Sequence, residues 1–282
     1  MNGAIMGDAK KKRQRTFELQ PWCIYCGGTE VATTEDHCPP RSLFLNKAWP
    51  VGYVFSSCES CNSTSARIEQ VVALLARLDP REDQTPQQEN EFLRLLSGVK
   101  NNNKGVIDGM VSMSTNQKRR RAKKLGIKPP DGQAYGELPI VAIHPQMEVA
   151  VEVFAAKLSK ALFYLHTGKI LPRDSPIFFN WLTNANILAD QNWLDVFMKT
   201  LGGTASLQRN SADLSSQFDY KFGIDGEQRF AAFTPYFGGS FGFAALTAPD
   251  PTRLRELLAR VKKRKGAAHD VFKEIYYPPC AG

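Results

Sequence analysis

Four cysteines in this chain of 282 residues fall into two Cys-x-x-Cys pairs, Cys23/Cys26 and Cys58/Cys61. Two such pairs can present four thiolates to one zinc ion in a tetrahedral arrangement. A site with four thiolate ligands is closed to substrate, so we expect this zinc to hold the fold and not to react. The alternative interpretation is a redox dithiol, but two such pairs on either side of one segment argue against it.

A second set of polar residues lies next to these pairs. Asp36 and His37 stand in the segment between them, and Asn62 directly follows the last cysteine. A zinc ion that gathers the cysteines would draw Asn62 towards Asp36 and His37. Carboxylate and amide oxygens suit a hard cation such as Mg²⁺ or Mn²⁺, and a neutral imidazole can deprotonate a water. We therefore expect Asp36 and Asn62 as metal ligands and His37 as general base; for an isolated histidine, a turn residue bonded to backbone would be the alternative.

Short elements must bring these residues together. Gly27 and Gly28 follow the first pair, where ligand-bearing turns need a positive φ. The segments "EVATTEDH" and "GYVFSSC" each read as a short strand, and they are separated by prolines that stop regular pairing. From Asn62 onwards apolar residues recur at three- and four-residue steps, which predicts a core-facing helix.

Three motifs, "CIYCGG", "TTEDHCPPRSLF" and "CESCN", together resemble the HNH endonuclease superfamily over residues 20–75. The resemblance implies a ββα-metal fold with structural zinc on the four paired cysteines. It implies His37 as general base, Asp36 and Asn62 as ligands of a catalytic divalent cation, and metal-assisted hydrolysis of phosphodiester bonds. Arg41 would steady a phosphate oxygen, or is a surface arginine. Proteins of this type resemble components of phage defence or restriction.

The chain departs from the family pattern in two places. The middle asparagine of such sites should lie between the histidine and the second cysteine pair, and Asn46 is the only candidate, earlier than expected. Ala66 stands where some members have a further histidine ligand, so we expect weak metal affinity without substrate. Glu69 lies two turns beyond Asn62 and could contribute, although a solvated helix glutamate is the simpler interpretation.

The rest of the chain predicts an α+β protein with four parts. We expect a basic flexible arm over residues 1–16, the HNH nuclease module over 17–96, a basic linker or loop over 97–136 and a larger α+β accessory domain over 137–282. Helices in the last part are predicted at 147–166, 187–201 and 252–262. A strand is expected at "LPIVAIH" and an antiparallel meander over 218–224, 229–235 and 240–247.

The charge of the chain favours a polyanionic partner. Its net charge is +8 and its pI is about 9.2. This charge favours nucleic acid as the partner, and DNA is the preferred candidate. The candidate backbone contacts are Lys118, Arg119, Arg120, Arg121, Lys123 and Lys124, with Lys262–Lys265 as a second group. Solvated charge is the alternative for both groups. A zinc-ribbon protein that binds nucleic acid without cutting it would share the cysteines and the charge.

Other features narrow the class of protein. No run of about 20 apolar residues and no secretory signal occur in the sequence, so we expect no membrane partner and a cytoplasmic location. The C-terminal domain could bind a protein partner. His144, His166 and His269 stand outside any ligand motif and are expected to be structural. Cys38 and Cys280 are unpaired in the sequence pattern.

Overall fold

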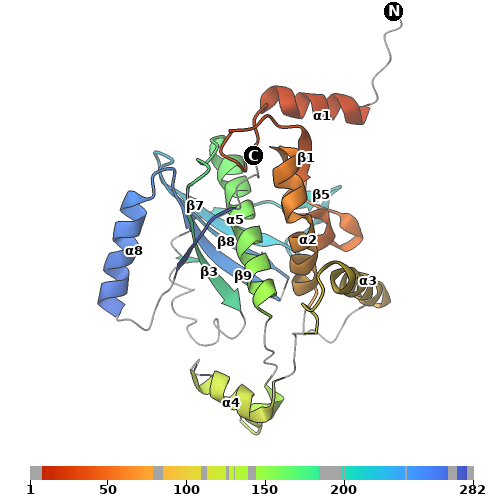
Figure 1. Ribbon diagram of the computed structural model, residues 1–282, viewed down its shortest axis with the longest axis vertical. Coiled ribbons are helices and arrows are strands. Elements are labelled where there is room, and N and C mark those ends of the chain that lie inside the picture. The colour runs from red at the N-terminus through yellow and green to blue at the C-terminus, as the bar shows by residue number, and fades with distance from the viewer. Residues whose placement is uncertain are drawn as a thin grey trace, which may run out of the picture.

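A six-stranded antiparallel sheet and the helices around it form the larger part of the fold (Figure 1). The computed structural model describes residues 8–78, 85–108, 113–124, 127–129, 131–138, 144–183, 198–199, 201–238, 240–265 and 272–277. The helices are α1 (Asp8–Leu19), α2 (Glu59–Ala76), α3 (Pro86–Asn102), α4 (Thr115–Lys124), α5 (Pro145–Thr167) and α8 (Thr252–Lys265). The strands are β1 (Thr34–His37), β2 (Val54–Ser57), β3 (Ile177–Thr183), β4 (Gly203–Thr204), β5 (Gln208–Arg209), β6 (Ala212–Asp213), β7 (Asp219–Ile224), β8 (Ala231–Phe237), β9 (Phe241–Thr247) and β10 (Lys273–Ile275). The predicted α+β class is confirmed.

The large sheet runs in the order β10-β3-β9-β8-β7-β4 and separates two apolar layers. Successive side chains of a strand point to opposite faces. Phe179 of β3 therefore packs in the main core, which also holds residues of α5, and Phe178 packs with Leu254 of α8 in a second cluster. The antiparallel meander predicted from the sequence is confirmed as β7, β8 and β9.

The cysteine-rich segment forms a small antiparallel hairpin followed by a helix. β1 pairs with β2 in a register that sets Asp36 opposite Phe55. α2 then begins at Glu59, one turn earlier than expected, with Cys58 as its N-cap residue. Asn62 therefore lies within the first turn of α2, and α2 packs against α3 and α5.

One buried core serves both parts of the chain. Phe55 and Val72 from the cysteine-rich segment belong to the same cluster of buried residues as Phe154 of α5 and Phe237 of β8. A segment of this size buries too little apolar surface on its own, so α2 lays its apolar face on α5. The boundary predicted at 97–136 does not separate two cores. That range is also partly helical, because it holds the end of α3 and all of α4.

Residues 8–16, the part of the expected flexible arm that the structure describes, are helical. Residues 8–16 belong to α1, in a run of Lys, Arg and Gln that favours helix. Arg13 donates to the backbone oxygen of Thr33 at 2.7 Å, and Thr16 donates to Glu35 Oε1 at 3.0 Å. These contacts attach α1 to the strand that carries the polar site residues.

Some predictions fall outside the described residues. They include most of the strand "LPIVAIH", most of the helix expected at 187–201, His269 and Cys280. The side chains of residues 262–265, the second basic group, also lie outside what the structure describes.

Within the described part of the chain, no helix has both the length and the apolar character that a membrane span requires.

Candidate metal centre and polar pocket

The two cysteine pairs converge on one point. The Sγ atoms of Cys23, Cys26, Cys58 and Cys61 all lie within 4.8 Å of one another, and all four residues are buried. Zinc bonded to four thiolates at about 2.3 Å would separate the sulfur atoms by about 3.8 Å, so the cluster fits a tetrahedral ion. The cluster could hold a structural metal such as zinc. Cys61 is disulfide-bonded in this structure, so all four thiolates could bind one ion only after that bond is reduced.

The turn after the first pair depends on a glycine. Gly27 has a φ of 76°, and a Cβ atom there would lie 2.3 Å from the backbone nitrogen of Arg173. Only glycine combines the positive φ with this close approach. The positive φ predicted for Gly27 and Gly28 is confirmed. Ile24 N also donates to Ser56 O of β2 at 3.1 Å, which joins the turn to the hairpin.

Burial shapes the chemistry of the cysteine cluster. Burial raises the pKa of Cys23 to about 12, so this thiol would stay protonated unless a cation replaced the proton. Lys160 of α5 is buried beside the cluster and donates to Tyr25 O at 3.0 Å and to Arg173 O at 3.1 Å. The pair Cys23/Cys26 is therefore attached to α5, from the C-terminal part of the chain.

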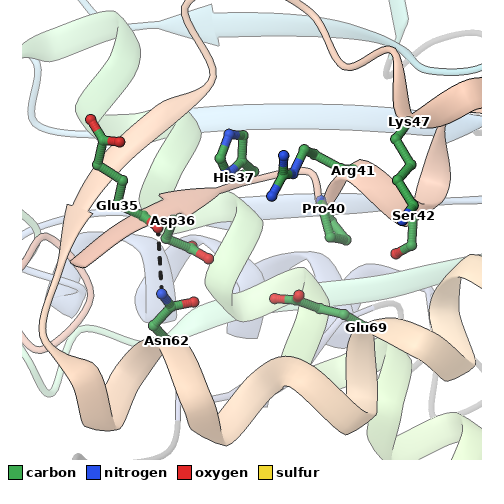
Figure 2. A pocket seen from close by; sticks show the side chains of 9 residues that line it. All are labelled: Glu35, Asp36, His37, Pro40, Arg41, Ser42, Lys47, Asn62 and Glu69. Atoms are coloured by element: carbon green, nitrogen blue, oxygen red, sulfur yellow. Dashed lines mark hydrogen bonds between the residues drawn. The ribbon is translucent and has the colours of Figure 1, made fainter. Parts of the chain in front are cut away.

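A polar pocket of about 440 Å³ opens next to the hairpin (Figure 2). Its lining residues are Glu35, Asp36, His37, Pro40, Arg41, Ser42, Lys47, Asn62 and Glu69. β1 supplies the first three, the segment after β1 supplies the next four, and α2 supplies the last two. The three residues expected to act together, Asp36, His37 and Asn62, thus line one pocket.

His37 ends β1 and is half-buried against Trp49. The two rings meet edge to face with their centroids 4.7 Å apart. Burial lowers the pKa of His37 and the Arg41 guanidinium lowers it further, while the Asp36 and Glu35 carboxylates act in the opposite direction. The imidazole is therefore neutral at pH 7, which is the state that a general base requires.

The amide of Asn62 is oriented by two hydrogen bonds. Its Nδ2 donates to Thr34 Oγ1 at 3.1 Å and to Glu35 O at 3.4 Å. Because the nitrogen is engaged with the hairpin, the Oδ1 atom turns towards the space beside Asp36 (Figure 2). This orientation fits an oxygen ligand of a hard cation.

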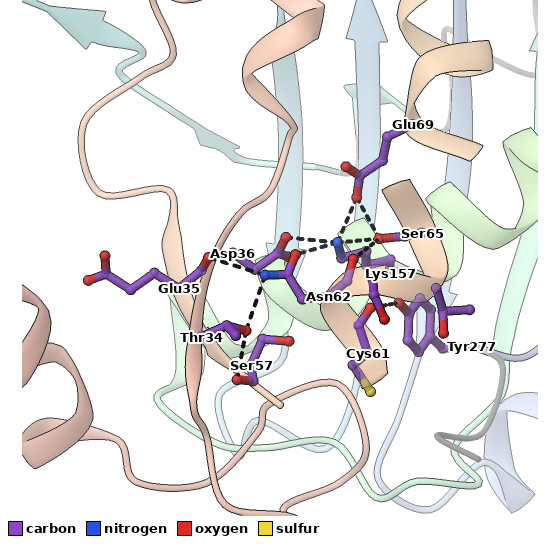
Figure 3. Close-up of polar contacts among 12 residues, drawn as sticks. Thr34, Glu35, Asp36, Ser57, Cys61, Asn62, Ser65, Glu69, Lys157 and Tyr277 are labelled. Carbon is purple, nitrogen blue, oxygen red and sulfur yellow. Dashed lines mark hydrogen bonds and ion pairs between the residues drawn. The ribbon is translucent and has the colours of Figure 1, made fainter. Parts of the chain in front are cut away.

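Asp36 is engaged by a lysine that sequence reasoning missed. The residue is only 3% exposed, and Lys157 Nζ of α5 lies 2.9 Å from its Oδ1 and 2.8 Å from its Oδ2 (Figure 3). Burial lowers the pKa of Lys157, but the Asp36 and Glu69 carboxylates raise it more, so the net shift is upward and the ammonium stays charged. Lys157 lies three residues after Phe154 and four before Ala161, in the apolar stripe of the predicted helix, and that position was the available signal.

Glu69 and Asn46, the two residues whose roles the sequence left open, lie in different places. Glu69 is not a solvated helix residue: it lines the pocket, accepts from Ser65 at 2.7 Å and pairs with Lys157 at 2.6 Å.

Asn46 is exposed and faces α3, where its side chain accepts from Gln87 and its backbone nitrogen donates to Glu91 at 3.1 Å. Asn46 does not line the pocket, so the question that the sequence left open, whether it is the middle asparagine of the motif, is answered against it.

Two arginines and a tryptophan form a basic rim beside His37. The Arg41 guanidinium lies 4.9 Å from the centroid of the Trp49 ring, and that of Arg209 lies 3.8 Å from it. Arg209 belongs to β5 and also donates to Trp49 O at 3.2 Å. Sequence reasoning did not find Trp49 or Arg209, because nothing in their local pattern connects residues so far apart in the chain.

The basic residues of α4 lie elsewhere. Lys118 donates to Gly136 O at 2.8 Å, whereas Arg119, Arg120, Arg121, Lys123 and Lys124 are exposed. Figure 1 shows α4 set apart from the large sheet, at the end of the molecule opposite α1. None of these side chains lines the polar pocket. They form a separate basic surface.

Comparisons of this chain with protein families, with curated proteins and with solved structures found no match.

Proposed function

We propose that this protein is an HNH-type endonuclease that hydrolyses phosphodiester bonds of nucleic acid with a divalent cation in the polar pocket. DNA is the preferred candidate substrate. The observation that supports this most is the arrangement of Asp36, His37 and Asn62, which line one pocket beside the cysteine cluster. The β1–β2 hairpin followed by α2 has the order of elements expected of the ββα-metal fold. In this proposal the cysteines bind zinc, and the zinc is structural.

Each pocket residue has a role that follows from its surroundings. His37, neutral at pH 7, takes the proton from the attacking water. Arg41 and Lys47 line the pocket, and Arg209 lies next to it over Trp49. All three offer cationic groups for the phosphate oxygens, and the guanidinium groups can bind them bidentately. Asp36 and Asn62 would hold Mg²⁺ or Mn²⁺, which when bound supplies Lewis-acid stabilisation of the charge on the leaving oxygen.

The basic surface of α4 would bind the backbone of the same nucleic acid. Arg119, Arg120, Arg121, Lys123 and Lys124 are exposed on this short helix, and contacts of this kind carry no base specificity. Lys118 would contribute less, because its ammonium already donates to Gly136 O. A role in phage defence or restriction rests on the family resemblance alone.

A non-catalytic zinc-ribbon protein that binds nucleic acid is the second candidate. The exposed basic residues of α4 favour it, because they lie apart from the pocket and need no catalysis to explain them. This candidate gives no reason for a half-buried neutral histidine, an oriented amide oxygen and a basic rim to share one pocket. The nuclease proposal accounts for all three.

A cleavage assay separates the two candidates. Wild type, His37→Ala and the control His144→Ala are incubated with plasmid, linear duplex, single-stranded DNA and RNA, each with Mg²⁺, Mn²⁺ or EDTA. We expect metal-dependent cutting by wild type and by the control, whose histidine caps α5 outside the pocket. We expect binding without cutting by His37→Ala. If wild type binds these nucleic acids but cuts none of them with either metal, the binding protein is the better account.

A further inference from the structure

The ammonium of Lys157 is buried behind the acidic side of the pocket, bonded to Asp36 and Glu69, which line it. An ammonium has three N–H donors. Three residues accept them here: Asp36 at 2.9 Å, Ser65 Oγ at 2.7 Å and Glu69 Oε1 at 2.6 Å (Figure 3). The Tyr25 ring, with its centroid 5.2 Å from Nζ, adds a cation–π contact. Lys157 is itself 0% exposed.

This arrangement sets the charge that a divalent cation would meet. With both carboxylates ionised, Asp36, Glu69 and Lys157 leave one net negative charge. Both oxygens of Asp36 already face the ammonium. A divalent cation on Asp36 would therefore lie a few ångströms from a fixed positive charge, where repulsion between cations is strong. Helix α5, which carries Lys157, comes from outside the segment that resembles the nuclease family.

We propose that Lys157 is a built-in counter-cation of the pocket, which keeps the affinity of the free protein for divalent cations low. Phosphate groups of the substrate would bring the negative charge that offsets Lys157, so the metal would bind together with the nucleic acid. This inference rests on the proposed function for its biological meaning, but it concerns metal affinity and can be tested without any substrate.

The test is titration of Mn²⁺ into the zinc-loaded protein without nucleic acid, with free Mn²⁺ measured by electron paramagnetic resonance. Lys157→Met removes the charge and keeps most of the side-chain volume, and Lys157→Arg keeps the charge. We expect Lys157→Met to bind Mn²⁺ at least about tenfold more tightly than wild type and Lys157→Arg to bind as weakly as wild type. Equal affinity in wild type and Lys157→Met would overturn the proposal.

A second variant covers a folding failure of Lys157→Met, which leaves two carboxylates without their cation. The double variant Lys157→Met/Glu69→Gln removes one charge of each sign and keeps the oxygens of Asp36 and Asn62. Zinc content and circular dichroism verify that each variant is folded. The net charge of the group is the same as in wild type, but the ammonium no longer holds the two oxygens of Asp36. The proposal therefore predicts tighter Mn²⁺ binding than wild type here too, and equal or weaker binding contradicts it.

The outcome is separable from that of the nuclease proposal. If wild type cuts nucleic acid but Lys157→Met leaves Mn²⁺ affinity unchanged, the counter-cation inference fails and the nuclease stands. If wild type cuts nothing but Lys157→Met gains Mn²⁺ affinity, the inference holds as a statement about the metal site and the nuclease proposal fails.

Discussion

The cysteine cluster and the polar pocket lie side by side but are built in different ways. All four cysteines come from residues 23–61 and are buried. The pocket is open to solvent, and two of its acidic residues, Asp36 and Glu69, are bonded to Lys157 of α5. Arg209, from the small β5–β6 hairpin, completes its basic rim.

The difference shows how a local scaffold can carry a site that depends on the whole chain. The cluster fixes the ends of the hairpin and the start of α2, and so brings Asp36 and Asn62 near each other. Lys157 of α5 and Arg209 of β5, which do not line the pocket, then add charge next to it. We therefore expect changes in the cluster to unfold the segment, and changes in the pocket to alter chemistry with little effect on folding.

The largest effect should follow from removal of one cluster cysteine. Cys58→Ser leaves three thiolates for the metal, and structural zinc sites contribute much of the folding free energy of small modules. We expect loss of zinc and a fall in unfolding free energy of more than about 3 kcal/mol. Metal analysis and thermal denaturation measure both.

The matched control for that variant is Cys38→Ser. Cys38 is also buried, but it lies outside the cluster, and burial raises the pKa of its thiol. This variant should keep its zinc. If Cys58→Ser kept its zinc and its stability as well, the cluster would not be the scaffold.

A smaller effect is expected at the basic surface of α4. Arg119→Gln/Arg120→Gln removes two exposed charges that would contact phosphates, so affinity for duplex DNA should fall about tenfold at low salt. The slope of log affinity against log salt should become less steep by about 2. The control Arg94→Gln/Arg229→Gln removes two exposed arginines outside α4. Equal losses in both double variants would mean that α4 is no binding surface.

The smallest effect concerns the contact between the hairpin and α5. Tyr220 OH lies 2.8 Å from both Tyr53 OH and His166 Nε2. Burial lowers the pKa of His166 in the folded state. The neutral imidazole therefore stabilises the fold above the unfolded-state pKa of about 6.5, and that contribution is lost as pH falls towards the lower, folded-state pKa.

We expect the stability of wild type to fall by more than that of His166→Gln between pH 7 and pH 5, because glutamine does not titrate. Urea denaturation at the two pH values measures the difference. The same pH dependence in both proteins would show that His166 does not report on this contact.

The sequence predicted the local features well. Four features were predicted from residues close in the chain. They are the convergence of the cysteine pairs, the positive φ of Gly27, the shared pocket of Asp36, His37 and Asn62, and the meander. These features follow from backbone geometry and short-range patterns.

The missing parts depend on long-range packing. Lys157 binds Asp36, which lies 121 positions earlier in the chain. Its place in the apolar stripe of a helix did not indicate which residue it would contact. Arg209 reaches Trp49 across 160 positions. The role of Asn46 stayed open because its position in the motif could not show that its side chain faces α3.

The most direct test is the single-turnover cleavage rate of His37→Ala on a nucleic acid that wild type cuts, with zinc content and melting temperature measured on the same samples. The account predicts that the rate falls about 10²- to 10⁴-fold, as for loss of a general base, while zinc content and melting temperature stay as in wild type. A variant that cuts at the wild-type rate would contradict the assignment of the pocket as the catalytic site.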